Sequence, residues 1–166
     1  GELNYSSAGS GAQPHLSAEM FKTMAGVNIT HVPYKGAGPQ MIALISGEAA
    51  LTFATAPSGV PLAKNGQARA IGVSGVTRIP ALPDTPTIQE TIPGYVAVGW
   101  NGLMGPAAMP QPVSDRIHSG VSAIMRRPDI REKLIALGAE PALSTPQEFA
   151  DLIRSELVKW AKVVKD

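Results

Sequence analysis

The first 73 residues show a repeating pattern in which a short apolar block, a loop of small residues and an amphipathic block follow one another. The apolar blocks are rich in β-branched and aromatic residues and predict strands over residues 3–5, 27–34, 49–53 and 68–73. The amphipathic blocks predict helices over residues 14–25, 40–45 and 60–65. Strands that are separated by helices pair in parallel, so the pattern favours an α/β fold with a helix-flanked, mostly parallel sheet.

Prolines interrupt this pattern in the middle of the chain. Residues 78–94 contain four of them at a spacing that excludes a helix and a central strand, so an ordered surface connection is expected there. Beyond it, alternation over residues 95–100 predicts one more strand. Helices are then predicted over residues 113–127 and 129–137.

The last helix has the clearest start signal. Thr145 precedes Pro146, and Glu148 follows three residues after Thr145, which predicts a capping box. The apolar residues behind it recur at helical spacing and predict a face packed into the core: Phe149, Leu152, Ile153, Leu157 and Trp160. The chain is therefore expected to end in an amphipathic helix.

Composition limits the classes of function. The 166 residues are 44% hydrophobic and 16% charged, which suits one globular domain, or one domain with part of another. A net charge of +1 and 5% aromatic residues give no footprint for nucleic acid. No apolar run approaches the roughly 20 residues that cross a bilayer, and the first residues lack the features of a signal peptide. Because exported proteins lose that peptide, this observation does not decide between cytoplasm and periplasm.

An enzymatic interpretation rests on the small-residue loop around Ser10. A small α/β hydrolase or transferase acting on an anionic substrate would pair Ser10 with His15, yet no carboxylate has an obvious role in orienting His15. The loop also departs from the Gly-x-Ser-x-Gly pattern of a nucleophile elbow. His15, His31 and His118 lie far apart in sequence and lack metal-ligand spacing, and His31 is expected to be a hydrogen-bonded structural residue. We therefore predict no catalytic residue, no metal and no cofactor, with the hydrolase or transferase kept as the alternative.

A recurrent device in the first half is more informative. Three times a predicted strand runs into a loop of Ser, Gly, Ala and Pro that leads into a helix, over residues 7–15, 35–39 and 54–58. The carboxyl ends of parallel strands share one edge of a sheet, and helix N-termini there present unpaired N–H groups with partial positive charge. Small side chains let an anion approach this backbone. Most α/β proteins have such loops without binding an anion, so the pattern alone leaves the ligand open.

The same loops carry a resemblance to a known family. Residues 3–16 (LNYSSAGSGAQPHL) and residues 31–39 (HVPYKGAGP) closely resemble the substrate-binding proteins of tripartite tricarboxylate transporters, the Bug or TctC-like family. Further matches follow in the family's order at residues 57–58, 81–87, 93–95, 100–103 and 137–141. The resemblance covers essentially the whole chain.

This resemblance implies a periplasmic-binding-protein fold of type II, in which two lobes close on a small organic acid. It implies that residues 1–98 form the ligand-binding second lobe and that residues 99–166, named the return segment below, complete the first lobe. It also implies a periplasmic receptor that presents a small organic carboxylate to membrane permease subunits. Family members normally begin upstream with more of the first lobe, so the unpaired sheet edges of this chain favour self-association.

The resemblance further implies where the ligand binds, because loop backbone and ordered water hold the carboxylates in this family. Carried onto this chain, the ligand-binding residues are Ser7, Gly9, Ser10, Gly11, His15, Lys35, Gly36, Ala37, Ala54, Thr55, Ala56, Pro57 and Ser58. Many relatives place an aspartate, suited to a ligand amino group, where this chain has Ala54. Since a buried ammonium without a counter-charge is costly, we expect mono- or dicarboxylates to be preferred over amino acids.

Overall fold

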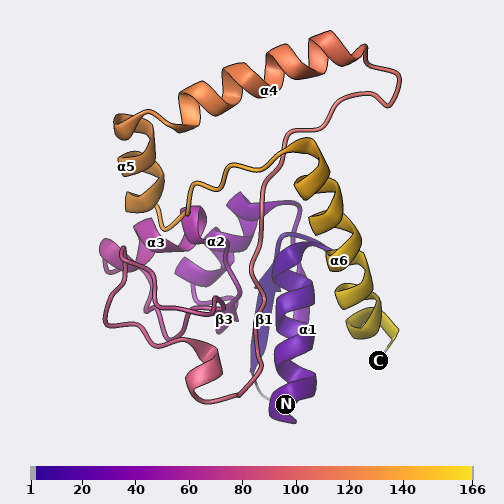
Figure 1. Cartoon of the computed structure of the whole chain (residues 1–166). Helices are drawn as coiled ribbons and strands as arrows, with labels where there is room; N and C mark the ends of the chain where they lie inside the picture. The colour runs from indigo at the N-terminus through magenta and orange to yellow at the C-terminus, as the bar shows by residue number, and fades with distance from the viewer. Residues whose placement is uncertain (1–2, 166) are drawn as a thin grey trace.

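The computed structural model describes residues 3–165, and its centre is a small parallel sheet. β1 (Asn4–Ser7) lies between β2 (Thr30–Pro33) and β3 (Leu51–Thr52), which gives the strand order β2-β1-β3 (Figure 1). Helices flank this sheet. The predicted fold class, α/β with a helix-flanked parallel sheet, is therefore confirmed.

One helix follows each strand. Their bounds are α1 (Gln13–Ala25), α2 (Ala37–Ile45) and α3 (Ala56–Lys64). α1 ends where predicted because Gly26 takes a left-handed conformation, with φ of 65°, and its N–H donates to the Lys22 carbonyl. α2 and α3 begin three to four residues earlier than predicted. Proline is tolerated in the first turn of a helix, so the small-residue loops already form the opening turns.

The core lies between the sheet and α1. Its buried and half-buried members include Tyr5, Ala18, Phe21, Ile29 and Phe53. Tyr95 joins them from a distant part of the chain, since its ring meets Phe21 edge-on and its hydroxyl donates to the Ser17 carbonyl at 2.9 Å. Four of the eight aromatic residues of the chain thus pack together where they fix α1 on the sheet.

Two predicted strands are wrong. Residues 68–73 contribute a single bridge at Val73 instead of a fourth strand. Residues 95–100 join no sheet, although the Ala97 N–H donates to the Ser74 carbonyl at 2.9 Å. The alternation nevertheless predicted burial correctly, because Tyr95 and Ala97 are fully buried. The alternation of apolar and polar residues indicates which side chains face the core. A strand also needs the backbone of a neighbouring strand to pair with in register.

The proline-rich connection over residues 78–94 is ordered, as predicted, but the prediction that it contains no helix is wrong. One helical turn forms between Pro86 and Pro93, where six residues in a row are free of proline. This is the 3₁₀ helix η1 (Ile88–Glu90), which begins with a capping box made by Thr87 and Glu90. The Arg78 guanidinium donates to both Glu90 oxygens, at 3.1 and 2.8 Å. These hydrogen bonds, with one from the Thr87 backbone, lower the pKa of Glu90 to about 2.

The return segment is helical over most of its length (Figure 1). Its helices are α4 (Gln111–Met125), α5 (Pro128–Ala136) and α6 (Pro146–Lys165). The predicted capping box at the start of α6 is confirmed. The Thr145 N–H donates to the Glu148 carboxylate at 2.7 Å, and the Glu148 N–H donates to the Thr145 hydroxyl at 3.2 Å.

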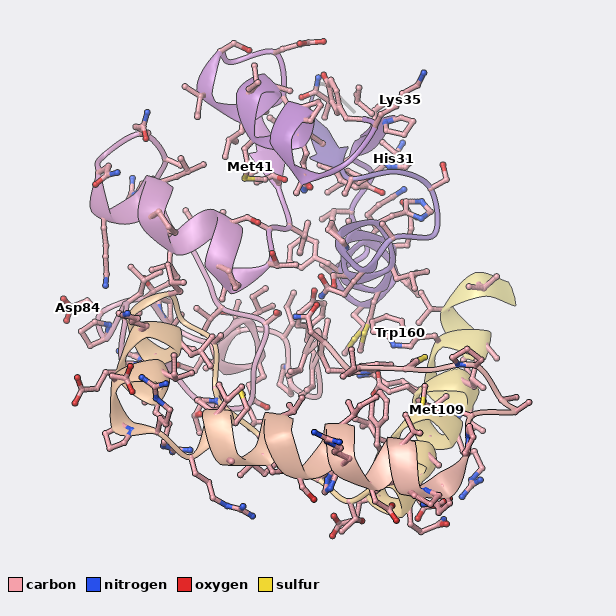
Figure 2. All side chains as sticks on the ribbon, turned by 90° about the horizontal axis from the view of Figure 1, so that it is seen from above. His31, Lys35, Met41, Asp84, Met109 and Trp160 are labelled. Atoms are coloured by element: carbon pink, nitrogen blue, oxygen red, sulfur yellow. The ribbon has the colours of Figure 1, made fainter. Side chains whose placement is uncertain are left out.

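The return segment packs less completely than the rest. α6 lies against α1, and α4 against α5. Figure 2 shows Met109 and Trp160 on the side of the molecule away from Met41. The prediction that α6 buries its apolar face is wrong for Leu152 and Leu157, the latter being 66% exposed, because no layer covers that face within residues 3–165. Self-association of the chain stays a prediction, which gel filtration at several concentrations tests.

Candidate functional site

The three predicted loops meet at one edge of the sheet. The first loop (residues 8–12) joins β1 to α1, the second (residues 34–36) joins β2 to α2, and the third (residues 53–55) joins β3 to α3. Because the strands are parallel and adjacent, their carboxyl ends lie side by side. The three helices therefore begin next to one another, and this edge is called the loop edge below.

At the loop edge, no N-cap side chain forms a capping hydrogen bond with the helix that follows it. The N-cap residues are Ala12, Gly36 and Thr55. Within residues 3–165, no acceptor is found for the backbone N–H groups of Gln13, His15, Ala37, Gly38 and Ala56. These groups need an external partner, and water or an anion supplies one.

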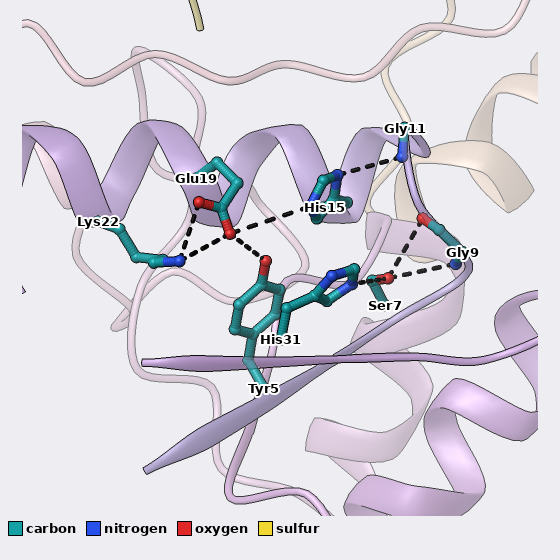
Figure 3. Close-up of polar contacts among 8 residues, drawn as sticks. All are labelled: Tyr5, Ser7, Gly9, Gly11, His15, Glu19, Lys22 and His31. Atoms are coloured by element: carbon teal, nitrogen blue, oxygen red, sulfur yellow. Dashed lines mark hydrogen bonds and ion pairs between the residues drawn. The ribbon is translucent and has the colours of Figure 1, made fainter. Parts of the chain in front are cut away.

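The first loop depends on two glycines in unusual conformations. Gly9 has φ of 129° and Gly11 has φ of 78°, which side chains with Cβ rarely adopt. The Ser7 hydroxyl accepts a hydrogen bond from the Gly9 N–H at 3.2 Å, and His15 Nδ1 accepts one from the Gly11 N–H at 3.1 Å (Figure 3). The loop is thus shaped by side chains that precede and follow it.

Gln40 of α2 links the two strands that lead into the first and third loops, and the sequence analysis missed it. Its buried side-chain amide lies 2.7 Å from the Thr52 hydroxyl of β3 and 3.3 Å from the Phe53 carbonyl, where the third loop begins. It also approaches the Ser6 carbonyl, just before the first loop, at 3.4 Å. Since Gln40 belongs to the opening turns of α2, its side chain ties the start of α2 to β1 and to the end of β3. A polar residue amid an apolar helix is the feature that could have drawn attention.

Two histidines that are distant in sequence stack beside the first loop. The rings of His15 and His31 lie 4.2 Å apart between centroids, and His31 stacks in turn on Tyr5 at 4.9 Å. The register of the sheet explains the contact between Tyr5 and His31, because these residues of β1 and β2 are paired neighbours. His31 is hydrogen-bonded, as predicted, with Nε2 2.6 Å from the Ser7 hydroxyl.

A carboxylate completes this cluster. Glu19 accepts hydrogen bonds from the Tyr5 hydroxyl at 2.6 Å and from the Lys22 ammonium at 2.9 Å (Figure 3). Burial favours the protonated form of Glu19, but these two donors and His15 outweigh it and hold the pKa of the carboxyl below its usual value. Burial lowers the pKa of His31, and the nearby His15 lowers it further. Burial and the bond to Glu19 raise the pKa of Tyr5.

The predicted site residues occupy three kinds of position. Exposed at or beside the loops are Ser10, Gly11, Lys35, Ala37, Thr55 and Pro57. Half-buried are Gly9, His15, Gly36, Ala54, Ala56 and Ser58. Ser7 is fully buried, so its hydroxyl is occupied in shaping the loop. The structure brings all three loops together, but it presents mostly backbone and small side chains.

The enzymatic alternative finds little support in this geometry. The sequence offered no obvious acid to orient His15, but the structure places Glu19 3.9 Å from His15 Nε2. However, within residues 3–165 no hydrogen bond joins Ser10 to His15, whose Nδ1 is occupied by Gly11. The other serine–histidine pair, Ser7 with His31, is closed to a substrate because Ser7 is fully buried.

The described residues also offer no group of three or more His, Cys, Asp or Glu side chains that could hold a metal ion. Every helix in the described part of the chain is too short or too polar to cross a membrane.

Comparison with known proteins decides the family. The model of the tripartite tricarboxylate transporter family receptor (TctC) matches residues 1–166. The chain belongs to this family. The resemblance noted in the sequence is thereby confirmed, and the members of this family are receptors of transporters and not enzymes.

Individual members of the receptor family agree with this assignment. A Pseudomonas sp. protein named UPF0065 protein in tcbD-tcbE intergenic region is 32% identical over 166 residues, which cover 99% of this chain and 49% of that protein. The structure of R. palustris Rpa4515 with adipate superposes with a TM-score of 0.95 at 36% identity, covering 99% of this chain and 55% of that one. MatC from Rhodopseudomonas palustris with bound malate gives a TM-score of 0.86 at 29% identity, covering 98% and 56%.

The chain therefore spans about half the length of these family members. What it shares with them includes the loop edge, because the matches extend over nearly all of its residues.

Proposed function

We propose that this chain provides the loop edge of a receptor that binds a small mono- or dicarboxylate outside the cytoplasm, in the periplasm, and presents it to the membrane permease of a tripartite tricarboxylate transporter. Residues 1–98 would serve as the ligand-binding lobe, and residues 99–166 as the segment that returns to the other lobe. The observation that carries the proposal is the meeting of three uncapped helix starts at one edge of the sheet.

The physical argument concerns charge. Each helix N-terminus carries a partial positive charge and several N–H donors, and three of them converge at the loop edge. Hydrogen bonds from N–H groups to a carboxylate are shorter and stronger than those between neutral groups. Small side chains such as those of Gly36 and Ala37 leave the backbone accessible. The exposed Ser10 and Thr55 hydroxyls and the Lys35 ammonium are proposed to add polar contacts.

The adipate and malate bound to two family members support a carboxylate as the class of ligand. Ala54 narrows the class, because it leaves the third loop without a negative charge for a ligand ammonium group. We expect glutarate to bind more tightly than glutamate, which differs from it by the amino group. Calorimetry with both acids measures this preference, and tighter binding of glutamate would contradict it.

The decisive experiment removes one backbone donor without changing a side-chain charge. Ala37→Pro deletes the N–H at the first position of α2, where proline fits a helix. The matched control is Gln111→Pro at the first position of α4, away from the loop edge. Titration calorimetry with adipate and with malate measures both variants. A hydrogen bond to a charged group contributes about 1.5–3 kcal/mol, so we expect Ala37→Pro to weaken binding about 10- to 100-fold.

The control variant is expected to bind like the unmodified chain. Absence of saturable binding of both acids to the unmodified chain would contradict the proposed function. Equal affinities of Ala37→Pro and the unmodified chain would contradict the assignment of the site to the loop edge.

A further inference from the structure

Three stacked rings lie beside the first loop (Figure 3). Tyr5 of β1, His31 of β2 and His15 of α1 form this ring column, with centroid distances of 4.9 and 4.2 Å and interplanar angles of 18° and 25° (Figure 3). The column is anchored at its side by Glu19, which accepts from the Tyr5 hydroxyl. Its members come from three separate elements, so the column ties α1 to the sheet at the point where the first loop begins.

Both imidazoles of the column contact groups that hold the first loop in place. His15 Nδ1 accepts from the Gly11 N–H at 3.1 Å. His31 Nε2 lies 2.6 Å from the Ser7 hydroxyl, which accepts from the Gly9 N–H at 3.2 Å. The amides of both positive-φ glycines of the loop are therefore held through a histidine, one directly and one through a serine.

We propose that His15 and His31 are positioning residues for the first loop, and that the loop binds carboxylate well only while His15 is neutral, so that acid weakens binding. The inference rests on the proposed function and adds a pH dependence to it. Nitrogen Nδ1 of His15 must present a lone pair to accept the Gly11 N–H, which an imidazolium cannot do. Protonation would place two N–H groups face to face, and the Gly11 bond would be lost.

The surroundings oppose a direct role for an imidazolium in binding the anion. Nε2 of His15 faces Glu19, at 3.9 Å, so charge gained by the ring is partly balanced by that carboxylate. Lys22, from the next turn of α1, already pairs with Glu19 at 2.9 Å. His31, packed against His15 from β2, resists taking up a second charge, because burial and the charge of His15 both lower its pKa. Tyr5, from β1, donates to Glu19 and completes the set of titratable groups around the two rings.

The test compares pH profiles of variants. Adipate binding is measured by calorimetry from about pH 8 to about pH 6, where imidazoles gain a proton and carboxylates stay largely ionised. Loss of the hydrogen bond from the Gly11 N–H to His15 should lower the affinity for adipate about three- to tenfold over this range. His15→Asn places an amide oxygen near the position of Nδ1 and does not titrate, so we expect its affinity to change less than about twofold over the same range. His15→Ala, which lacks the acceptor, is expected to bind weakly throughout.

The control is His118→Asn, which changes a distant histidine of α4 whose ring contacts the Ser144 carbonyl. It is expected to keep the pH dependence of the unmodified chain. A profile of the unmodified chain that is flat, or that rises toward pH 6, would overturn the inference while leaving the proposed function standing.

A readout without ligand separates the two proposals. In ¹⁵N-labelled protein, the Gly11 amide resonance should move as the His15 ring titrates, and this movement should be absent in His15→Asn. If adipate binds at no pH, the proposed function fails, yet the Gly11 resonance still decides whether the histidine holds the loop. A Gly11 amide that ignores the His15 titration would refute the positioning role.

Discussion

Residues 3–98 and residues 99–165 both contain amphipathic helices, yet they differ sharply in burial. Every fully buried apolar side chain of the described chain lies in the first region, from Tyr5 to Ala97. In the second region, α4 exposes Val113, Ile117 and Val121, and α6 exposes much of its apolar face. An amphipathic pattern thus predicts a helix, whereas burial of its apolar face requires a layer to pack against.

A matched pair of methionine substitutions tests most directly whether the two regions differ in packing. Met41 in α2 is 9% exposed and Met104 in the return segment is 64% exposed. Met41→Ala leaves a cavity in a packed layer and should lower the free energy of unfolding by about 2–5 kcal/mol. Met104→Ala should change it by less than about 0.5 kcal/mol. Urea denaturation measures both values, and equal losses would mean that the second region is packed as firmly as the first.

Helix caps sharpen the comparison at a smaller scale. Thr145 caps α6 with a hydrogen bond to the Glu148 N–H, whereas Thr55 at the start of α3 makes no capping bond to the backbone. Thr145→Ala should destabilise the start of α6 by about 1 kcal/mol, seen as faster amide hydrogen exchange in its first turns. Thr55→Ala should leave exchange at the start of α3 nearly unchanged. A larger effect at Thr55 would contradict the view that helix starts at the loop edge are left open for a ligand.

The smallest expected effect is a change in the free energy of unfolding at low pH, caused by protonation of Glu90. The folded pKa of Glu90, about 2, lies below the ordinary value of 4.5, so ionised Glu90 stabilises the fold above about pH 4.5. This contribution is lost as the pH falls from about 4.5 toward 2. We expect Glu90→Gln to show a shallower decrease of unfolding free energy across that window than the unmodified chain. Parallel decreases in the two proteins would show that the Arg78 pair does not contribute in solution.

The sequence predicted local structure better than pairing. Gly26 as a helix end and the Thr145 capping box were predictable, because both follow from backbone chemistry within a few residues. Residues 68–73 and 95–100 have strand-like periodicity, but the sequence does not state which backbone lies beside them. Local pattern fixes which side chains turn inward, and long-range packing fixes whether a ladder forms.

The sequence predicted the three loops of the candidate site, but it did not predict the side chains that hold these loops in place. Small residues after each strand indicated the three helix starts, since parallel strands bring their carboxyl ends together. The stacking of Tyr5 on His31 depends on strand register, His15 joins them from α1, and Gln40 contacts residues from two other elements. Such contacts join segments that are far apart in the chain, so no short-range pattern signals them. The assignment of individual ligand contacts stays a prediction.

The hydrogen bonds of Gln40 have a consequence for how a ligand would bind to and leave the loop edge. Because the buried Gln40 amide joins α2 to β1 and to the end of β3, the loop edge has its shape without a ligand, and binding of the proposed ligand would require little rearrangement of the chain. If the proposed ligand binds there, its release would have to come from a movement of whole lobes that uncovers the loop edge, while the three helix starts keep their positions.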